Sequence, residues 1–111
     1  MLASGAVGFS SAIAYAAQTA SPIVAKVGPG RTIGLQLPNG SVPPRLKAGR
    51  YTIVVNDRSR RDNFHLLGAV NRKTGIAFIG KRRWIVLLKK GSYRYRSDAH
   101  PRLLSGGFQV Y

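Results

Sequence analysis

The sequence has no cysteine, no glutamate and only three acidic residues, Asp57, Asp62 and Asp98. The absence of cysteine excludes disulfide bonds, thiolate metal ligands and cysteine nucleophiles. Beyond residue 20, no window of three helical turns has the apolar spacing of an amphipathic helix. These absences leave a small, disulfide-free protein whose core must be built from elements other than helices.

Basic residues dominate the charge: 18 Lys and Arg side chains give a formal net charge of +15 in 111 residues. A domain with this charge attracts polyanions, and we expect an anionic cell-wall polymer or a membrane surface as the partner. The alternative is an ordinary solvated surface with no partner. No DNA- or RNA-binding motif is present, so nucleic acid is not expected. The basic clusters are Arg58, Arg60 and Arg61; Arg72 and Lys73; Lys81, Arg82 and Arg83; Lys89 and Lys90; and Arg94 and Arg96.

Residues 1–20 carry no charged side chain and are rich in Ala, Gly and Ser. This composition is typical of the apolar stretch of a secretory signal, and Ala14-Tyr15-Ala16 fits the small-x-small cleavage rule. A membrane anchor is the alternative, but the segment has too many Gly, Ser and Gln residues for a good membrane span. We expect residues 1–20 to be a signal peptide or an apolar N-terminal segment. Residues 21–111 are then one domain, located outside the cytoplasm (secreted, periplasmic or at the cell surface).

Short apolar runs beyond residue 20 alternate with Gly, Pro and basic clusters, a pattern typical of β-strands joined by turns. Every second side chain of residues 32–37 is apolar and would share one face, and residues 51–55 suit a half-buried sheet. The continuous apolar run over residues 84–88 predicts a strand buried on both faces. Further strands are expected at residues 64–67, 93–96 and 108–111. Such short strands predict an all-β sandwich or barrel.

One local pattern occurs twice: residues 46–51 are Leu-Lys-Ala-Gly-Arg-Tyr and residues 88–93 are Leu-Lys-Lys-Gly-Ser-Tyr. In each copy a Gly supplies the turn, and Tyr51 or Tyr93 opens the next strand. In Greek-key sandwiches a Tyr in this place turns its hydroxyl back onto nearby backbone. The repeated pattern favours a Greek-key sandwich; the alternative is two unrelated turns.

Two histidines occupy places that suggest a metal site. His65 lies in the middle of the chain, in Asn63-Phe64-His65-Leu66, and His100 lies in a loop before the last expected strand. The order, spacing and flanking Gly-Tyr turns over residues 31–111 resemble the small bacterial cupredoxins related to plastocyanin. Those proteins carry an early His on a strand, then a C-terminal loop with Cys-x-x-His and a Met a few residues later. The resemblance implies a cupredoxin-like Greek-key β-sandwich of about seven strands.

Carried over residue by residue, the resemblance assigns the two His ligands to His65 and His100, the Cys position to Ser97 and the Met position to Leu104. A blue-copper site is a trigonal His₂Cys arrangement with a weak axial ligand that tolerates variation. Leu104 would therefore only retune the site, whereas Ser97 removes the thiolate. Because two imidazoles alone hold copper weakly, we expect no cofactor beyond weak residual copper. The alternative is that both histidines are structural, hydrogen-bonded to each other or to backbone.

Ser97, Asp98 and His100 also invite comparison with a catalytic triad. A working triad needs an oriented base and an oxyanion hole, usually assembled from separate segments, so we expect no enzymatic activity and no small-molecule substrate. The hypothesis is an exported cupredoxin-like domain that has lost blue-copper electron transfer. Two alternatives stay open: a copper-handling protein that uses His65 and His100, and a basic module that binds anionic polymers or membrane surfaces.

Overall fold

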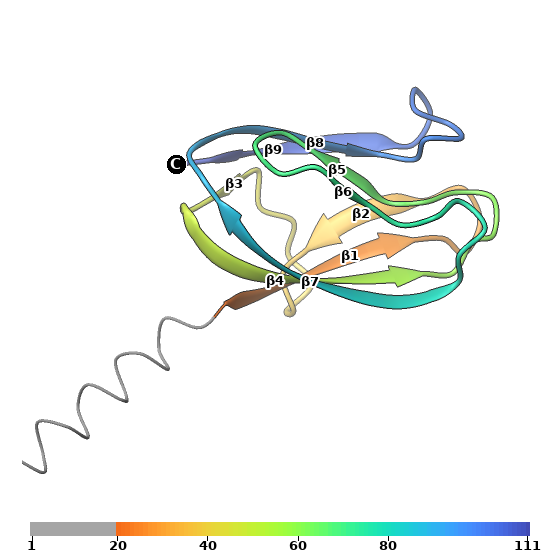
Figure 1. Cartoon of the computed structure of the whole chain (residues 1–111), viewed down its shortest axis with the longest axis horizontal. Coiled ribbons are helices and arrows are strands. Elements are labelled where there is room, and N and C mark those ends of the chain that lie inside the picture. Colours follow the sequence, from red (N-terminus) through yellow and green to blue (C-terminus); the bar gives the residue numbers. More distant parts are fainter. Residues whose placement is uncertain (1–19) are drawn as a thin grey trace, which may run out of the picture.

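The computed structural model describes residues 20–111. Apart from Ala20, the predicted export segment lies outside the described residues. In the described part, strands form two facing layers, and the connections gather at the two ends of the sandwich (Figure 1). No helix within residues 20–111 has the length and apolar character needed to cross a membrane. The arrangement confirms the predicted all-β sandwich.

Each layer is a mixed β-sheet. The first sheet has the spatial order β2 (Ile33–Gln36), β1 (Ser21–Val27), β4 (Gly49–Asp57) and β7 (Gly80–Leu88). The second has the order β3 (Arg45–Leu46), β9 (Ser105–Val110), β8 (Gly91–Arg96), β5 (His65–Leu67) and β6 (Arg72–Lys73). The β1–β4 and β3–β9 pairs are parallel, and the other pairs are antiparallel.

The described residues form nine strands, whereas about seven were expected and six were placed in the sequence. Two of the additional strands, β3 and β6, have only two residues each. The third is β1, which the sequence analysis missed although Ile23, Ala25 and Val27 alternate along it and are fully buried. In the sheet, β1 pairs antiparallel with β2 across the short turn over residues 28–32 and in parallel with β4, a partner distant in sequence.

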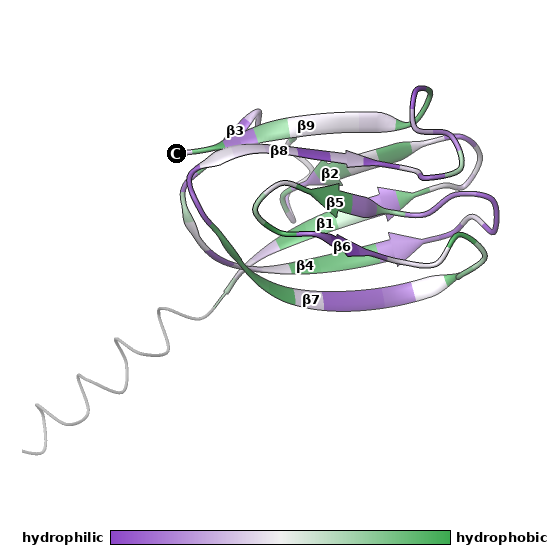
Figure 2. Cartoon of the chain, turned by 45° about the horizontal axis from the view of Figure 1, so that its top comes forward, coloured by the Kyte–Doolittle hydropathy of each residue, from purple (hydrophilic) through white to green (hydrophobic). Residues whose placement is uncertain are grey.

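The core lies between the sheets and is rich in aromatic side chains. The Phe64 ring stacks on Tyr95 with a centroid distance of 5.3 Å and lies 6.2 Å from Trp84. Tyr93 and Phe108, on the neighbouring strands β8 and β9, stack at 5.3 Å. Aromatic pairs of this kind add about 0.5–1.5 kcal/mol each beyond the burial of their area. The apolar segments of several strands are visible in green in Figure 2.

The prediction that residues 84–88 are buried on both faces is wrong. Trp84, Val86 and Leu88 point into the core, but Ile85 and Leu87 are 63% and 52% exposed. The strand β7 lies at the edge of its sheet, and only its inner face meets the second sheet. A continuous apolar run here marks one buried face and one apolar outer face.

The two predicted tyrosine turns are confirmed. Tyr51 donates its hydroxyl hydrogen to the carbonyl oxygen of Lys47 at 2.5 Å, and Tyr93 donates to that of Lys89 at 2.8 Å. In both copies the acceptor lies four residues before the tyrosine, so the repeated sequence pattern produces the same local structure twice. Each bond fixes the turn that leads into β4 or β8.

Tyr93→Phe is expected to lower the free energy of unfolding by about 1 kcal/mol, because a neutral hydrogen bond is lost while the ring stays packed. Urea denaturation followed by fluorescence measures the change. Tyr111→Phe is the matched control, since Tyr111 is 54% exposed and its hydroxyl has no such bond within the described residues. An equal loss in both variants would contradict a specific role for the Tyr93 hydroxyl.

Candidate functional site

Three loops meet at one end of the sandwich. The parallel pair of β1 and β4 ends with Val27 beside Asp57, so the loops that follow these two strands begin side by side. On the other sheet, Arg96 pairs with both His65 and Ser105, which brings the β8–β9 loop to the start of β5. The candidate site residues lie on these loops, at the right-hand end in Figure 1.

A carboxylate joins two of the predicted site residues. The Oδ1 atom of Asp62 lies 2.7 Å from Ser97 Oγ, which donates to it, and 2.6 Å from His100 Nδ1. A carboxylate only accepts, so Nδ1 of His100 carries the hydrogen in this contact. Asp62 and Ser97 are buried, whereas the His100 side chain is 36% exposed. Asp62, Ser97 and His100 therefore form a small polar cluster that is buried at Asp62 and Ser97 and reaches the surface at His100.

The electrostatic surroundings keep Asp62 ionised. Burial by itself raises the pKa of Asp62, but hydrogen bonds from His100 and Ser97 and the positive charge of Arg31 outweigh burial and hold the pKa below its usual range. The cluster thus contains a fixed negative charge, and this charge is satisfied by hydrogen-bond donors from a loop far away in the sequence.

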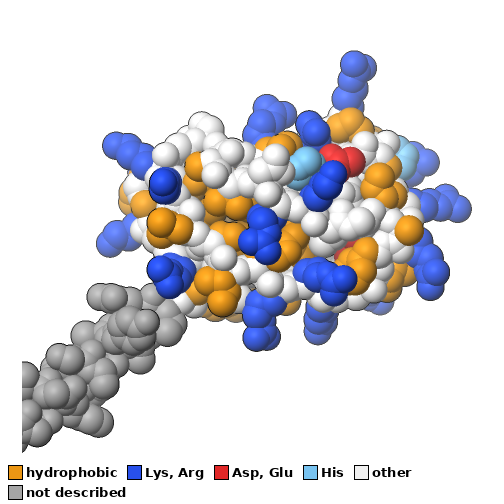
Figure 3. Space-filling view, in the orientation of Figure 1, with side chains coloured by type: hydrophobic (Ala, Val, Ile, Leu, Met, Phe, Trp, Pro, Cys, Tyr) orange, Lys and Arg blue, Asp and Glu red, His pale blue; other side chains and the backbone are white. Residues whose placement is uncertain are grey.

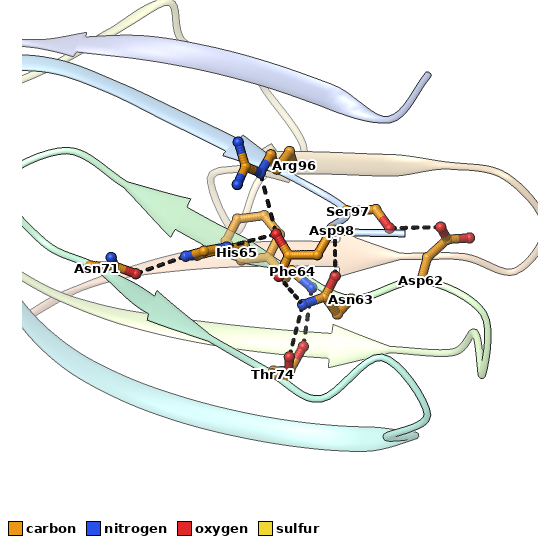
Figure 4. Close-up of polar contacts among 9 residues, drawn as sticks. All are labelled: Asp62, Asn63, Phe64, His65, Asn71, Thr74, Arg96, Ser97 and Asp98. Atoms are coloured by element: carbon orange, nitrogen blue, oxygen red, sulfur yellow. Dashed lines mark hydrogen bonds and ion pairs between the residues drawn. The ribbon is translucent and has the colours of Figure 1, made fainter. Parts of the chain in front are cut away.

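His65 lies in a second polar cluster, with different partners. Its Nδ1 donates to Asp98 Oδ1 at 2.8 Å, and its Nε2 lies 2.7 Å from Asn71 Oδ1 (Figure 4). Arg96 also donates to Asp98 Oδ1, at 3.2 Å. Burial alone raises the pKa of Asp98, but the bonds from His65, Asn63 and Arg96 outweigh it and lower the pKa to about 2.

Asn63 connects the two loops that carry these clusters. Its side-chain oxygen accepts the backbone N–H of Asp98 at 2.7 Å, and its amide nitrogen donates to Asp98 Oδ2 at 3.1 Å and to the carbonyl oxygen of Thr74 at 2.8 Å. The Thr74 hydroxyl in turn accepts the backbone N–H of Phe64 at 3.0 Å. Because Asn63 and Thr74 are both buried, these bonds hold the site loops in one arrangement.

The structure therefore brings Ser97 and His100 together, but joins them to Asp62 rather than to His65. Both ring nitrogens of His65 are engaged by Asp98 and Asn71. The expectation that structural histidines would bond to each other or to backbone is wrong, because both rings bond to side chains that the sequence analysis did not connect with them. The assignment of His65 and His100 as metal ligands stays a prediction.

Leu104 is buried, with 4% of its surface exposed, and it closes the β8–β9 loop. The backbone N–H of Ser97 donates to the Leu104 carbonyl oxygen, and the Leu104 N–H donates to the His100 carbonyl oxygen, both at 2.9 Å. The leucine in the predicted Met position thus packs inward beneath the loop that presents Ser97 and His100.

Asp62 is the site residue that sequence reasoning missed. One indication was present in the sequence. The chain has only three acids, and a carboxylate three positions before the candidate ligand His65 competes strongly for the same hydrogen-bond partners. Residues 62–64 precede the first residue of β5, so strand alternation could not show which of them points toward the Ser97 loop.

The surroundings of Ser97 do not support a catalytic triad of Ser97, Asp98 and His100. Ser97 donates its hydroxyl hydrogen to a carboxylate instead of to an imidazole, and its side chain is fully buried. Asp98, the third member suggested by the sequence, bonds to His65 in the other cluster. A serine nucleophile needs a base within hydrogen-bond reach and an accessible oxygen.

A third carboxylate, Asp57 at the end of β4, is fully buried at the same end of the sandwich. Its Oδ1 accepts the backbone N–H of Ser59 at 2.9 Å, while its Oδ2 has no hydrogen-bond partner within the described residues. Burial raises the pKa of Asp57 to about 6, with a further small increase from the charge of Asp62, although the Ser59 bond acts in the opposite direction.

Asp57→Asn is expected to stabilise the protein by about 2 kcal/mol at pH 8, because an amide removes the cost of an ionised, half-satisfied carboxylate. The folded-state pKa is raised from 3.8 to about 6, so the native carboxyl loses stability as the pH rises through this window. The advantage of Asp57→Asn should therefore vanish below about pH 4. Urea denaturation of both proteins from acid to mildly alkaline pH measures it, and a pH-independent difference would contradict the assignment.

The donor set does not fit a blue-copper site. No group of three or more His, Cys, Asp or Glu side chains capable of holding a metal occurs among residues 20–111. The side chains that meet are a carboxylate, a hydroxyl and one imidazole, whereas a blue-copper site needs two imidazoles and a thiolate. The hydroxyl of Ser97 supplies neither the negative charge nor the soft sulfur of that ligand.

The similarity to known proteins comes from solved structures and concerns the fold. No family model and no curated protein matches the chain. A structure of rusticyanin, described as a copper protein, has a TM-score of 0.63 and 12% identity, covering 85% of this chain and 78% of that one. Rusticyanin from Thiobacillus ferrooxidans gives 0.60 and 14% over 85% and 78% of the two chains. A mutant amicyanin with Cu(I) gives 0.53 and 19% over 82% and 83%.

Rusticyanin and amicyanin are cupredoxins. The chain therefore has a cupredoxin-like fold, and the resemblance drawn from its Gly-Tyr turns and histidine spacing is confirmed at the level of the fold.

Proposed function

We propose that this chain is an exported, non-enzymatic cupredoxin-like module that has lost blue-copper electron transfer. The observation that carries the proposal is the bonding of the Asp62 carboxylate to both Ser97 and His100. These are the two loop positions where the resemblance expects the Cys and second His ligands. Export is supported by the uncharged, Ala-rich residues 1–20.

The loss of electron transfer follows from the chemistry of the missing ligand. A copper thiolate bond supports rapid exchange between Cu(I) and Cu(II), and a neutral hydroxyl gives no comparable bond. Ser97 is also committed, as a donor, to Asp62. Both ring nitrogens of His65 already have hydrogen-bond partners, so copper binding through either nitrogen requires one of these bonds to break.

Absorption spectroscopy and voltammetry of the full chain after equilibration with Cu(II) test the proposal. The expected result is no intense blue absorption band and no reversible copper couple at the electrode. A blue band or a reversible couple in the unmodified chain would overturn it. His65→Ala and His100→Ala separate the copper-handling alternative, which requires tight, colourless one-to-one binding that disappears in both variants.

A second candidate function, binding of an anionic polymer or membrane surface, is favoured by the unbalanced charge of the folded domain. Within residues 20–111, Arg96 is the only Lys or Arg side chain in an ion pair. Lys and Arg side chains project around the outline of the molecule, and little acidic surface is visible among them (Figure 3). Cations without partners at the surface favour anionic ligands.

Binding driven by these cations must weaken with salt. For phosphate polymers the logarithm of the affinity is expected to fall by about 0.7–0.9 per neutralised phosphate for each tenfold rise in salt. Fluorescence titrations of the full chain with a phosphate polymer and with anionic vesicles, at several salt concentrations, give the slope. Retention that does not change with salt would contradict this function.

A further inference from the structure

A surface pocket with a volume of about 410 Å³ opens beside the Asp62 cluster. Its walls come from the β1–β2 loop and the β4–β5 loop, and His100 contributes from the β8–β9 loop. The lining residues are Gly30, Arg31, Arg58, Ser59, Arg60, Arg61, Asp62 and His100. The size is within the range of ordinary ligand sites, about 300–1,000 Å³. We call it the arginine pocket.

The charge of this pocket is strongly positive. Four arginines line it against one carboxylate, Asp62. That carboxylate is 2% exposed, and its Oδ1 already accepts hydrogen bonds from Ser97 and His100. None of the four arginines forms an ion pair with any carboxylate of residues 20–111. Like charges held together in this way repel one another, and an anion between them would relieve the repulsion.

Backbone hydrogen bonds fix the walls of the pocket before any ligand arrives. The N–H of Arg58 donates to the Val27 carbonyl oxygen at 2.7 Å, which ties the β4–β5 loop to the end of β1. The N–H of Gly28 donates to the Thr32 carbonyl oxygen at 2.8 Å and closes the β1–β2 turn. A site whose loops are already positioned loses less entropy when it binds.

We propose that the arginine pocket binds a phosphate group, at the end of the sandwich where cupredoxins would place copper ligands. This inference gives the second candidate function a location, and it rests on that function. Each guanidinium presents five N–H donors in a planar fork that matches phosphate oxygens. A single carboxylate is satisfied by one such fork, whereas several neighbouring forks suit a tetrahedral anion with more charge and more acceptor oxygens.

The phosphate could be a free ion or part of a polymer, and titrations of the full chain distinguish the two. Calorimetry with inorganic phosphate, pyrophosphate and linear polyphosphate is compared with polyglutamate, a polymer that offers carboxylates only. One-to-one saturation by inorganic phosphate or pyrophosphate indicates a small phosphate ligand. Saturation by polyphosphate alone indicates phosphate groups within a polymer. Equal affinity for polyglutamate and polyphosphate would overturn the assignment to phosphate.

Two triple variants with the same net charge locate the site. The pocket triple replaces Arg58, Arg60 and Arg61 by Gln, and the control triple replaces Lys47, Lys89 and Lys90 by Gln. The control lysines are exposed and lie at the end of the sandwich away from the pocket, next to the start of β4 and the end of β7, where Gly49 pairs with Leu88. The pocket triple is expected to lose at least about tenfold in phosphate affinity, and the control triple less than about twofold.

The outcomes separate two questions: whether the arginine pocket is the site, and whether the chain binds anions at all. If both triples lose affinity equally, the chain binds anions over its whole surface and the pocket is not the site. If the unmodified chain binds none of the phosphate probes at low salt, the anion-binding function itself fails. Thermal denaturation checks that both triple variants are folded. If the pocket triple is not folded, the single variants Arg60→Gln (pocket) and Lys90→Gln (control) repeat the comparison.

Discussion

A chain carrying both Asp62→His and Ser97→Cys is expected to bind Cu(II) stoichiometrically and to turn blue, whereas Ser97→Cys alone should stay colourless. Ser97 and His100 already contact one atom, Asp62 Oδ1, at 2.7 and 2.6 Å. Replacing the acid by imidazole and the hydroxyl by thiol converts this trio into the His₂Cys set of a blue-copper site.

The single variant distinguishes the two possible assignments of the first histidine ligand. If His65 held that position, Ser97→Cys alone would complete the ligand set, because the new thiol would join His65 and His100, and it would give at least a partial blue spectrum. The contacts of His65 with Asp98 and Asn71 predict the opposite result. Absorption spectroscopy and paramagnetic resonance of copper-loaded Ser97→Cys and of the double variant provide the comparison.

A further substitution serves as the control for this prediction. His65→Gln added to the double variant should leave the blue band in place, because His65 belongs to the Asp98 cluster. Loss of the band on His65→Gln, in a variant that circular dichroism shows to be folded, would contradict the assignment of Asp62 to the ligand position. Leu104 is left unchanged, since the axial position tolerates variation.

Asp98→Ala is expected to lower the free energy of unfolding by about 2 kcal/mol at pH 7, because several hydrogen bonds to a charged, partly buried carboxylate are lost. The substitution removes the acceptor of His65 and of Arg96 and one of the two acceptors of the Asn63 amide. His65 is 8% exposed, so water replaces its lost bond poorly. Urea denaturation measures the loss.

The effect of Asp98→Ala depends on pH with a defined sign. The pKa of Asp98 is lowered from 3.8 to about 2 in the folded state, so the carboxylate contributes its stability above about pH 4 and loses it as the pH falls toward about 2. The difference between the native chain and Asp98→Ala should therefore shrink across this window. Arg94→Ala, a change at an exposed position of β8, is the control and should show no such trend. A pH-independent difference for Asp98→Ala would contradict the charge assignment.

Local patterns predicted the fold class and the tyrosine turns because their causes are local. A Gly three residues after a leucine, followed two residues later by Tyr, fixes a turn and a side-chain direction without help from the rest of the chain. The hydroxyls of Tyr51 and Tyr93 therefore bond where the pattern expects them. The same reasoning placed Ser97 and His100 in one loop, where the structure joins them to one acceptor.

Long-range pairing explains what the sequence could not predict. The carboxylate that meets Ser97 and His100 comes from residue 62, 35 and 38 positions away, and it lies in an irregular loop where no periodicity shows direction. His65 was the more visible candidate because imidazole is the common copper ligand, but it begins a strand and points into a different cluster. The exposure of Ile85 likewise depends on its position on the outer face of its sheet, away from the second sheet, which the continuous apolar run does not reveal.

A Gly in the last strand has a role that only the packed structure explains. A Cβ atom at Gly106 would overlap the hydroxyl end of Tyr95 on the neighbouring strand. Composition alone assigns the pair Gly106-Gly107 to a turn, yet both residues lie inside β9. The absent side chain makes room for an aromatic ring, a requirement set by the partner strand.

The central proposal is that this chain, which has a cupredoxin-like fold, does not use its loop end as a copper site. The most direct test is a Cu(II) titration of the full chain by calorimetry, followed by paramagnetic resonance. No saturable one-to-one binding is expected, and the signals should not change in His65→Ala or His100→Ala. Tight one-to-one binding that is lost in both variants would contradict the loss of the copper site and identify a copper-handling protein with a remodelled site.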